Sequence, residues 1–191
     1  PSASTEVLRA VALLGPPAIE VTLEPGLDAL PHFNPDLDGP GSTPPPAVAA
    51  FRARVGAADA LLICSPEYAH GVPGVLKNAL DWIVGSGELA GKPVALLNAS
   101  SRATYAWNSL RETLTVMSAR VVPEASITVP LDGRRLDAQG IAADPELAAL
   151  VRAALRHLAT PPRPVVGDQA APEDVRWLEE QINEFNFAAT G

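Results

Sequence analysis

Apolar residues follow two different spacings along this chain. Stretches with an apolar residue every three or four positions predict helices, and short runs rich in Val, Ile and Leu predict buried strands. The predicted helices cover residues 5–14, 47–55, 72–84, 105–118, 145–158 and 172–185. The predicted strands cover residues 18–23, 58–64, 92–97 and 119–129, the last interrupted at Pro123-Glu124. Strands that alternate with helices at this spacing predict a parallel sheet covered on both faces.

Proline and glycine mark the joints between these elements. Gly15, Pro16 and Pro17 end the first helix, and the proline-rich stretch 25–46 is predicted to be a surface loop. A second proline-rich stretch begins at residue 160 and precedes the last predicted helix. We therefore expect one folded domain over residues 1–159, followed by a linker and a helical tail over residues 160–191.

Composition narrows the classes of function. The sequence has 191 residues, 47% of them hydrophobic, and a formal net charge of −8. That charge disfavours a nucleic acid or an anionic membrane surface as partner, and no apolar run reaches the ~20 residues that a membrane span needs. Cys64 is the single cysteine, so no internal disulfide forms and a reducing, cytoplasmic location is expected.

Candidate chemistry lies in the loops that follow the strands. In open α/β sheets, ligands bind beyond the carboxyl ends of the strands, which here means the loops after Cys64, Leu97 and Val129. The loop after Cys64 reads SPEYAHGVPGVLKNALDWI. Its prolines and glycines constrain the backbone so that Glu67 and Tyr68 follow the strand end directly, where backbone amides meet a ligand.

This loop resembles the signature of a known family. Pro66-Glu67-Tyr68, Pro73-Gly74 and the run LKNALDW at residues 76–82 are similar to the motif of the NADPH-dependent FMN reductases, which include quinone, chromate and azo-dye reductases. The resemblance implies a flavodoxin-like three-layer sandwich with a parallel five-stranded sheet in the order 2-1-3-4-5. It also implies FMN and NADPH as cofactors.

The resemblance also implies a set of binding residues. They are Ser2, Ser4, Pro66, Glu67, Tyr68, Ala69, His70, Ser100 and Ser101. The loop 66–70 would border the flavin ring, and Ser100 and Ser101 would hydrogen-bond its pyrimidine side, although the loop 98–103 also reads as an ordinary solvated connection. Ser2 and Ser4 serve either as phosphate ligands or as a helix cap. The family commonly has Asn at the position of Ala69, so one polar contact to the ring would be lost.

The start of the sequence departs from the family pattern. Members of the family open with a strand and a Gly-Ser-x-Arg-type loop around the FMN phosphate, whereas this sequence opens at Pro1, near the end of that loop. The first strand of the expected sheet is therefore missing. Three explanations stay open: residues upstream of Pro1 supply the strand, residues 186–191 fill its place, or the chain no longer binds flavin.

The implied reaction passes a hydride from NADPH to FMN and on to a quinone, a flavin or a similar small acceptor. Since the flavin carries this chemistry, we predict no catalytic acid or base and no metal ligand. In the family, the helix that carries Lys77, Asn78, Asp81 and Trp82 often packs against a partner, so a homodimer or homotetramer is expected.

Other classes of function have less support. His32, His70 and His157 lack the nucleophile elbow of a hydrolase and any metal-ligand spacing, and no G-x-G-x-x-G run is present for tight dinucleotide binding. The serious alternative is a flavodoxin-like module that has lost catalysis and serves as a binding or assembly partner.

Overall fold

The computed structural model describes residues 2–39 and 41–160. Its α-helices are α1 (Ala3–Leu14), α2 (Pro46–Ala57), α3 (Gly74–Val84), α4 (Thr104–Val116), α5 (Ala138–Ala143) and α6 (Pro145–Ala159). Its strands are β1 (Leu61–Cys64), β2 (Pro93–Asn98), β3 (Arg120–Val121) and β4 (Ile127–Thr128), with short 3-10 helices η1 (Pro35–Leu37) and η2 (Pro123–Ala125). The linker and helical tail predicted beyond residue 160, and the segment 186–191, lie outside the described residues.

The four strands form one parallel sheet in which β2 is central. β1 pairs with β2, and β3 and β4 both pair with β2 as well. The strand predicted over residues 119–129 is divided by η2 at the predicted interruption, because Pro123 has no N–H to donate to a ladder. Ser126 bridges the interruption: its Oγ accepts from Leu96 N at 3.1 Å and donates to Val122 O at 2.8 Å.

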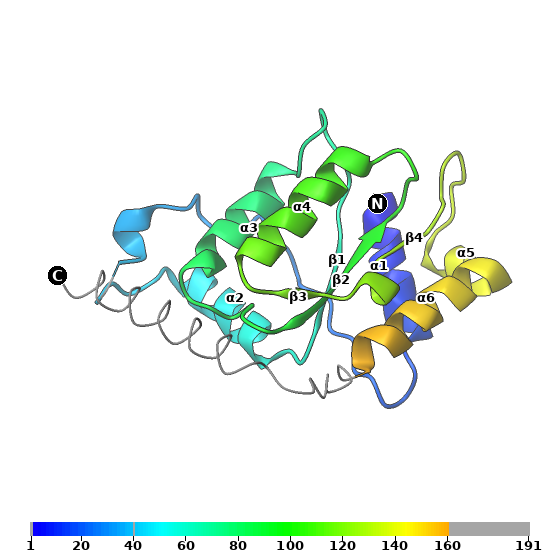
Figure 1. Cartoon of the computed structure of the whole chain (residues 1–191), viewed down its shortest axis with the longest axis horizontal. Helices are drawn as coiled ribbons and strands as arrows, with labels where there is room; N and C mark the ends of the chain where they lie inside the picture. The colour runs from blue at the N-terminus through cyan, green and yellow to red at the C-terminus, as the bar shows by residue number, and fades with distance from the viewer. Residues whose placement is uncertain (1, 40, 161–191) are drawn as a thin grey trace, which may run out of the picture. The chain divides into compact units, whose positions relative to one another are not determined.

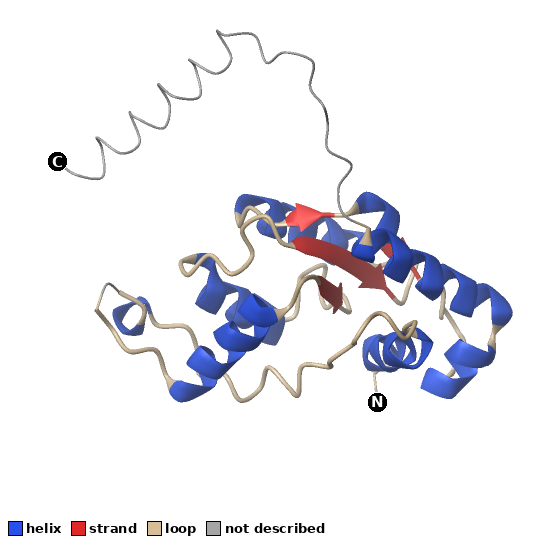
Figure 2. Cartoon of the chain, turned by 90° about the horizontal axis from the view of Figure 1, so that it is seen from below, coloured by secondary structure: helices blue, strands red, loops and turns tan. Residues whose placement is uncertain are grey.

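Helices cover both faces of this sheet. α2, α3 and α4 lie on one side and α1, α5 and α6 on the other (Figure 1), and in Figure 2 the red strands lie between the blue helices. The alternation of side chains along β2 explains the two layers. Val94 and Leu96 join the core formed with α2, α3 and α4, whereas Leu97 joins the core formed with α1, α5 and α6. The predicted α/β fold with a parallel sheet is confirmed.

The strand predicted over residues 18–23 is wrong. This segment is an extended loop, although Ile19 and Val21 pack against the core of α1, α5 and α6. A strand needs a neighbouring strand to pair its backbone N–H and C=O groups, and within the described residues this segment has none. Its alternation of apolar residues therefore reflects packing on one side and not membership of the sheet.

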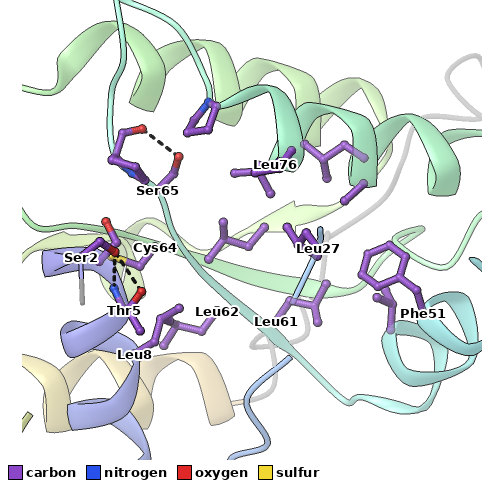
Figure 3. Close-up of a pocket in the computed structure, with 18 of the residues that line it drawn as sticks. Ser2, Thr5, Leu8, Leu27, Phe51, Leu61, Leu62, Cys64, Ser65 and Leu76 are labelled. Carbon is purple, nitrogen blue, oxygen red and sulfur yellow. Dashed lines mark hydrogen bonds between the residues drawn. The ribbon is translucent and has the colours of Figure 1, made fainter. Parts of the chain in front are cut away.

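The second edge of β1 is open within the described residues. An apolar cavity of about 370 Å³ lies beside it, between β1, α1, α2 and α3. Leu8 of α1, Phe51 of α2 and Leu76 of α3 line this cavity together with Leu61 and Leu62 of β1 (Figure 3). In the order 2-1-3-4-5 this is the position of the first strand, so the structure contains only part of the expected five-stranded order.

The proline-rich loop is anchored to α3. Asn78 Oδ1 accepts from Phe33 N at 2.8 Å, and Asn78 Nδ2 and Trp82 Nε1 both donate to Pro31 O, at 3.0 and 2.8 Å. The ring of Phe33 meets that of the fully buried Trp82 edge to face, with 5.0 Å between centroids. Two residues of the LKNALDW motif thus hold the chain's own loop in place.

Candidate functional site

A pocket of about 430 Å³ lies at the carboxyl ends of β1 and β2. Three segments that are far apart in the sequence meet there: residues 2–4 at the start of α1, residues 65–68 after β1, and residues 98–100 with Arg102 and Ala103 after β2. The position agrees with the general rule for open α/β sheets. Of the three loops that the strand ends indicated, those after Cys64 and Leu97 line the pocket and the one after Val129 does not.

The pocket gathers most, but not all, of the predicted binding residues. Those that line it are Ser2, Ser4, Pro66, Glu67, Tyr68 and Ser100. Those outside its lining are Ala69, His70 and Ser101. The residues outside belong to the same two loops, so they act on the pocket through the conformation of those loops.

The first wall of the pocket is the N-terminus of α1. Ser2 caps this helix: its Oγ accepts from Thr5 N at 3.2 Å, and its carbonyl accepts from Glu6 N at 3.0 Å. The amides of Ala3 and Ser4 precede the first intrahelical bond, so they are free of intrahelical partners. Such amides, together with the helix dipole, favour a bound anion.

The tip of the loop after β1 is a tight hairpin. Tyr68 and Gly71 exchange both backbone hydrogen bonds, at 3.1 and 2.9 Å, and the two residues between them have positive φ, 49° at Ala69 and 60° at His70. Hairpins of this kind favour Asn, Asp or Gly at these positions. Ala69 stands where the family commonly has Asn. Because Ala69 lies outside the pocket lining, this difference concerns the backbone conformation of the turn. The ring of His70 stacks on that of Tyr105, with centroids 4.1 Å apart.

The carboxylate of Glu67 is hydrogen-bonded to the first turn of α4. Its Oε2 accepts a hydrogen bond from Ala106 N at 2.9 Å, in the first turn of α4. The N-cap residue of α4, Ala103, makes no side-chain cap, so the carboxylate of Glu67 takes that place and also meets the positive end of the helix dipole. Glu67 thereby ties the loop after β1 to the helix after β2.

The loop after β2 is held from two sides. From inside, the buried Asn98 accepts from Ser100 N at 3.1 Å and donates to Ala103 O at 3.0 Å. From outside, Asp132 accepts from Ser100 Oγ at 2.5 Å and from the N and Oγ of Ser101 at 2.9 and 3.0 Å. These hydrogen bonds lower the pKa of Asp132 to about 2. The sequence analysis pointed to the loop after Val129 but did not single out Asp132.

The lining of the pocket includes two charged side chains, Glu67 and Arg102. Glu67 accepts its hydrogen bond from α4. The side chain of Arg102 is 87% exposed, and its Nε lies 3.7 Å from Asp132 Oδ1. Below the pocket, burial raises the pKa of the Cys64 thiol to about 12, against a smaller lowering by a hydrogen bond with Ser4. The Cys64 thiol is therefore protonated at neutral pH, and it lines the apolar cavity beside β1 rather than this pocket.

The described residues contain no group of three or more His, Cys, Asp and Glu side chains arranged to hold a metal ion. None of their helices combines the length and apolar character that a membrane crossing requires.

A parallel sheet between two helical layers, with a pocket at the carboxyl ends of its strands, is the architecture of the open α/β proteins, which include the flavodoxin-like class. The family model described as NADPH-dependent FMN reductase matches residues 2–133. The chain belongs to this family, whose members are NAD(P)H-dependent FMN reductases and quinone reductases.

Individual relatives agree with this assignment. An NAD(P)H-dependent FMN reductase of Pseudomonas aeruginosa is 34% identical over 81% of this chain and 84% of its own length. A quinone reductase of Escherichia coli strain K12 is 32% identical over 61% of this chain and 64% of its own. Among solved structures, FerB of Paracoccus denitrificans, a flavoenzyme NAD(P)H:(acceptor) oxidoreductase, aligns with a TM-score of 0.65 at 26% identity and covers 82% of this chain and 90% of its own.

Proposed function

We propose that this chain binds FMN in the pocket at the carboxyl ends of β1 and β2, takes a hydride from NADPH, and reduces a quinone, a flavin or a similar small acceptor. The observation that carries the proposal is the meeting of residues 2–4, 65–68 and 98–103 around one pocket. A bound FMN supplies the redox chemistry, because it accepts a hydride and returns electrons to a second substrate. The protein has to bind and orient it.

The α1 end of the pocket suits the FMN phosphate. The amides of Ala3 and Ser4 have no intrahelical acceptor, and the helix dipole favours a dianion at this position. Arg102 adds the positive charge of the pocket lining. Ser2 contributes by capping the helix, which keeps the first turn in shape for the phosphate.

The two strand-end loops suit the flavin ring. Pro66, Glu67 and Tyr68 form one wall and Ser100 belongs to the other. Because the Glu67 carboxylate accepts from Ala106 N, the backbone of the first wall stays fixed relative to α4. We assign Pro66 and Tyr68 to the ring edge and no acid or base to the reaction.

A flat acceptor suits the mouth of the pocket. Tyr68 and Tyr105 are 64% and 58% exposed, and His70 stacks on Tyr105 beside them. Exposed aromatic faces stack well on planar rings. Relatives named as quinone reductases support a quinone as the acceptor.

We also propose that the protein works in the cytoplasm as a homodimer or homotetramer. The single cysteine supports a reducing compartment. The exposed apolar side chains of Val75 and Val84 on α3, together with Tyr105 on α4, offer a surface for a second copy. Analytical ultracentrifugation of the purified protein tests this assembly, and a monomer at all concentrations contradicts it.

The function is tested by titrating the purified protein with FMN and following the quenching of flavin fluorescence. We expect saturable binding, bleaching of the flavin absorbance by NADPH without oxygen, and recovery of the colour on addition of a benzoquinone. Arg102→Ala should weaken FMN binding, whereas Arg111→Ala, an exposed arginine on α4, should not. A colourless protein that takes up no FMN contradicts the proposal and favours the non-catalytic module.

A further inference from the structure

The loop after β4 follows the loop after β2 closely, although the two are about thirty residues apart in the sequence. Val129 N donates to Asn98 O at 2.7 Å, and Leu131 N donates to Ala99 O at 3.2 Å. This pairing carries Asp132 to the turn at Ser100 and Ser101, where its carboxylate accepts three hydrogen bonds. Asp132 itself does not line the pocket.

The amide groups of residues 100–104, in the loop after β2, already have acceptors within the chain. Ser100 N donates to Asn98 Oδ1 and Ser101 N to Asp132. The amides of the next three residues donate to Ser100 Oγ, Ser100 O and Arg102 O, at 3.3, 3.4 and 3.0 Å. If Ser100 and Ser101 contact the pyrimidine side of the flavin, they therefore do so through a side chain and not through a free backbone amide.

The hydrogen bond to Asp132 also determines whether the hydroxyl of Ser100 can donate to a ligand or accept from it. Its hydrogen is donated to Asp132 at 2.5 Å, and a hydroxyl has only one hydrogen to donate and two lone pairs to offer. One lone pair accepts from Arg102 N. The group that Ser100 offers to the pocket is thus an acceptor, which suits an N–H of a ligand and opposes a carbonyl.

We propose that Asp132 is a positioning residue of the flavin site, which holds Ser100 and Ser101 so that Ser100 Oγ accepts a hydrogen bond from the N3–H of the flavin. This inference rests on the proposed binding of FMN in this pocket. The carboxylate acts through the serines and does not touch the flavin. In this arrangement the loop after β4 makes Ser100 a hydrogen-bond acceptor toward the pocket, although this loop does not line the pocket itself.

The test compares FMN with N3-methyl-FMN, which lacks the N3–H, by fluorescence titration of wild type, Asp132→Asn and Ser100→Ala. We expect wild type to bind FMN at least about tenfold more tightly than the methylated flavin, since the site loses a hydrogen bond when the donor is absent. In Asp132→Asn the amide donates to the serine, whose hydrogen turns toward the pocket, so the preference for FMN falls to about twofold or less. Ser100→Ala should lose the same preference.

The matched control is Asp59→Asn, at an exposed aspartate that precedes β1 at the opposite end of the strand. The Asp59→Asn variant should keep the wild-type preference for FMN over N3-methyl-FMN. A far-ultraviolet circular dichroism spectrum like that of wild type and a cooperative thermal transition establish that each variant is folded at the temperature of the titration. An Asp132 that only stabilises the fold would leave the preference for FMN intact in Asp132→Asn, and that result overturns the inference. If wild type binds neither flavin, the proposed function itself fails and the inference falls with it.

Discussion

The carboxylate of Glu67 accepts a hydrogen bond from the amide of Ala106 at 2.9 Å, across 39 residues of sequence. This single contact gives α4 a cap that its own N-cap residue, Ala103, does not provide. The negative charge of Glu67 thus stabilises a helix end beside the pocket.

Removing this cap should destabilise the fold. We expect Glu67→Ala to lower the free energy of unfolding by about 1 kcal/mol, as for other lost helix caps, and Glu67→Gln to lower it by less, because an acceptor oxygen is retained. Urea denaturation followed by circular dichroism measures both. Glu112→Ala, at an exposed position of α4, is the control, and a loss in Glu67→Ala no larger than in this control contradicts the capping role.

The left-handed conformation at residue 69 predicts a stabilising substitution. Ala69 has φ of 49°, a region that is unfavourable for Ala and that Asn tolerates better. Ala69→Asn should raise the free energy of unfolding by roughly 0.5–1 kcal/mol. The matched control is Ala53→Asn on the exposed face of α2, which should lower it by about 0.5 kcal/mol, since Ala is the better helix former. Equal effects of both substitutions in urea melts would refute the argument from φ.

Asn78 anchors the proline-rich loop to α3, so we expect this loop to open locally when Asn78 is replaced. Asn78→Ala removes two hydrogen bonds to the loop, one from Phe33 N and one to Pro31 O, and should cost about 2 kcal/mol of stability. It should also speed cleavage within residues 25–46 by a nonspecific protease, followed by mass spectrometry. Lys77→Ala, which breaks only a surface pair with Asp81 on the same helix, should cost about 0.5 kcal/mol or less. Unchanged cleavage in Asn78→Ala would show that other contacts hold the loop.

The environment of Asp132 predicts a pH dependence. Hydrogen bonds from Ser100 and Ser101 lower its pKa from the ordinary 3.8 to about 2 in the folded chain. A folded-state pKa below the unfolded one means that the stabilisation is complete above the unfolded value and is lost as the pH falls through the folded value. The stability difference between wild type and Asp132→Asn should therefore be constant near neutral pH and shrink between about pH 4 and pH 2. Thermal melts across this range measure it, and a difference that stays constant down to pH 2 contradicts the shift.

The sequence alone predicted the helices and strands that depend only on the pattern of their own residues. The buried run over residues 92–97 and the helical spacing after Pro73 both appear within a residue or two of their predicted bounds, as β2 and α3. The extended segment 18–23 shows the limit of such patterns, because a strand depends on a partner that its own residues do not specify.

The candidate site was predictable where a motif marks it and not where distant residues meet. The signature located Pro66, Glu67 and Tyr68 at the pocket. It did not reveal that Glu67 caps α4 or that Asp132 holds the loop after β2, because both contacts join positions more than 30 residues apart. The spacing of Asn78 and Trp82 likewise gave no sign that both bind Pro31.

The open edge of β1 has a consequence for how this chain behaves at high concentration. Within the described residues, the second edge of β1 has no neighbouring strand and faces a space walled by leucine and phenylalanine. An edge of this kind is a template for strand addition from another molecule. In any state in which this edge is uncovered, we expect aggregation to start at Leu61–Cys64, and a segment that covers these residues to oppose it.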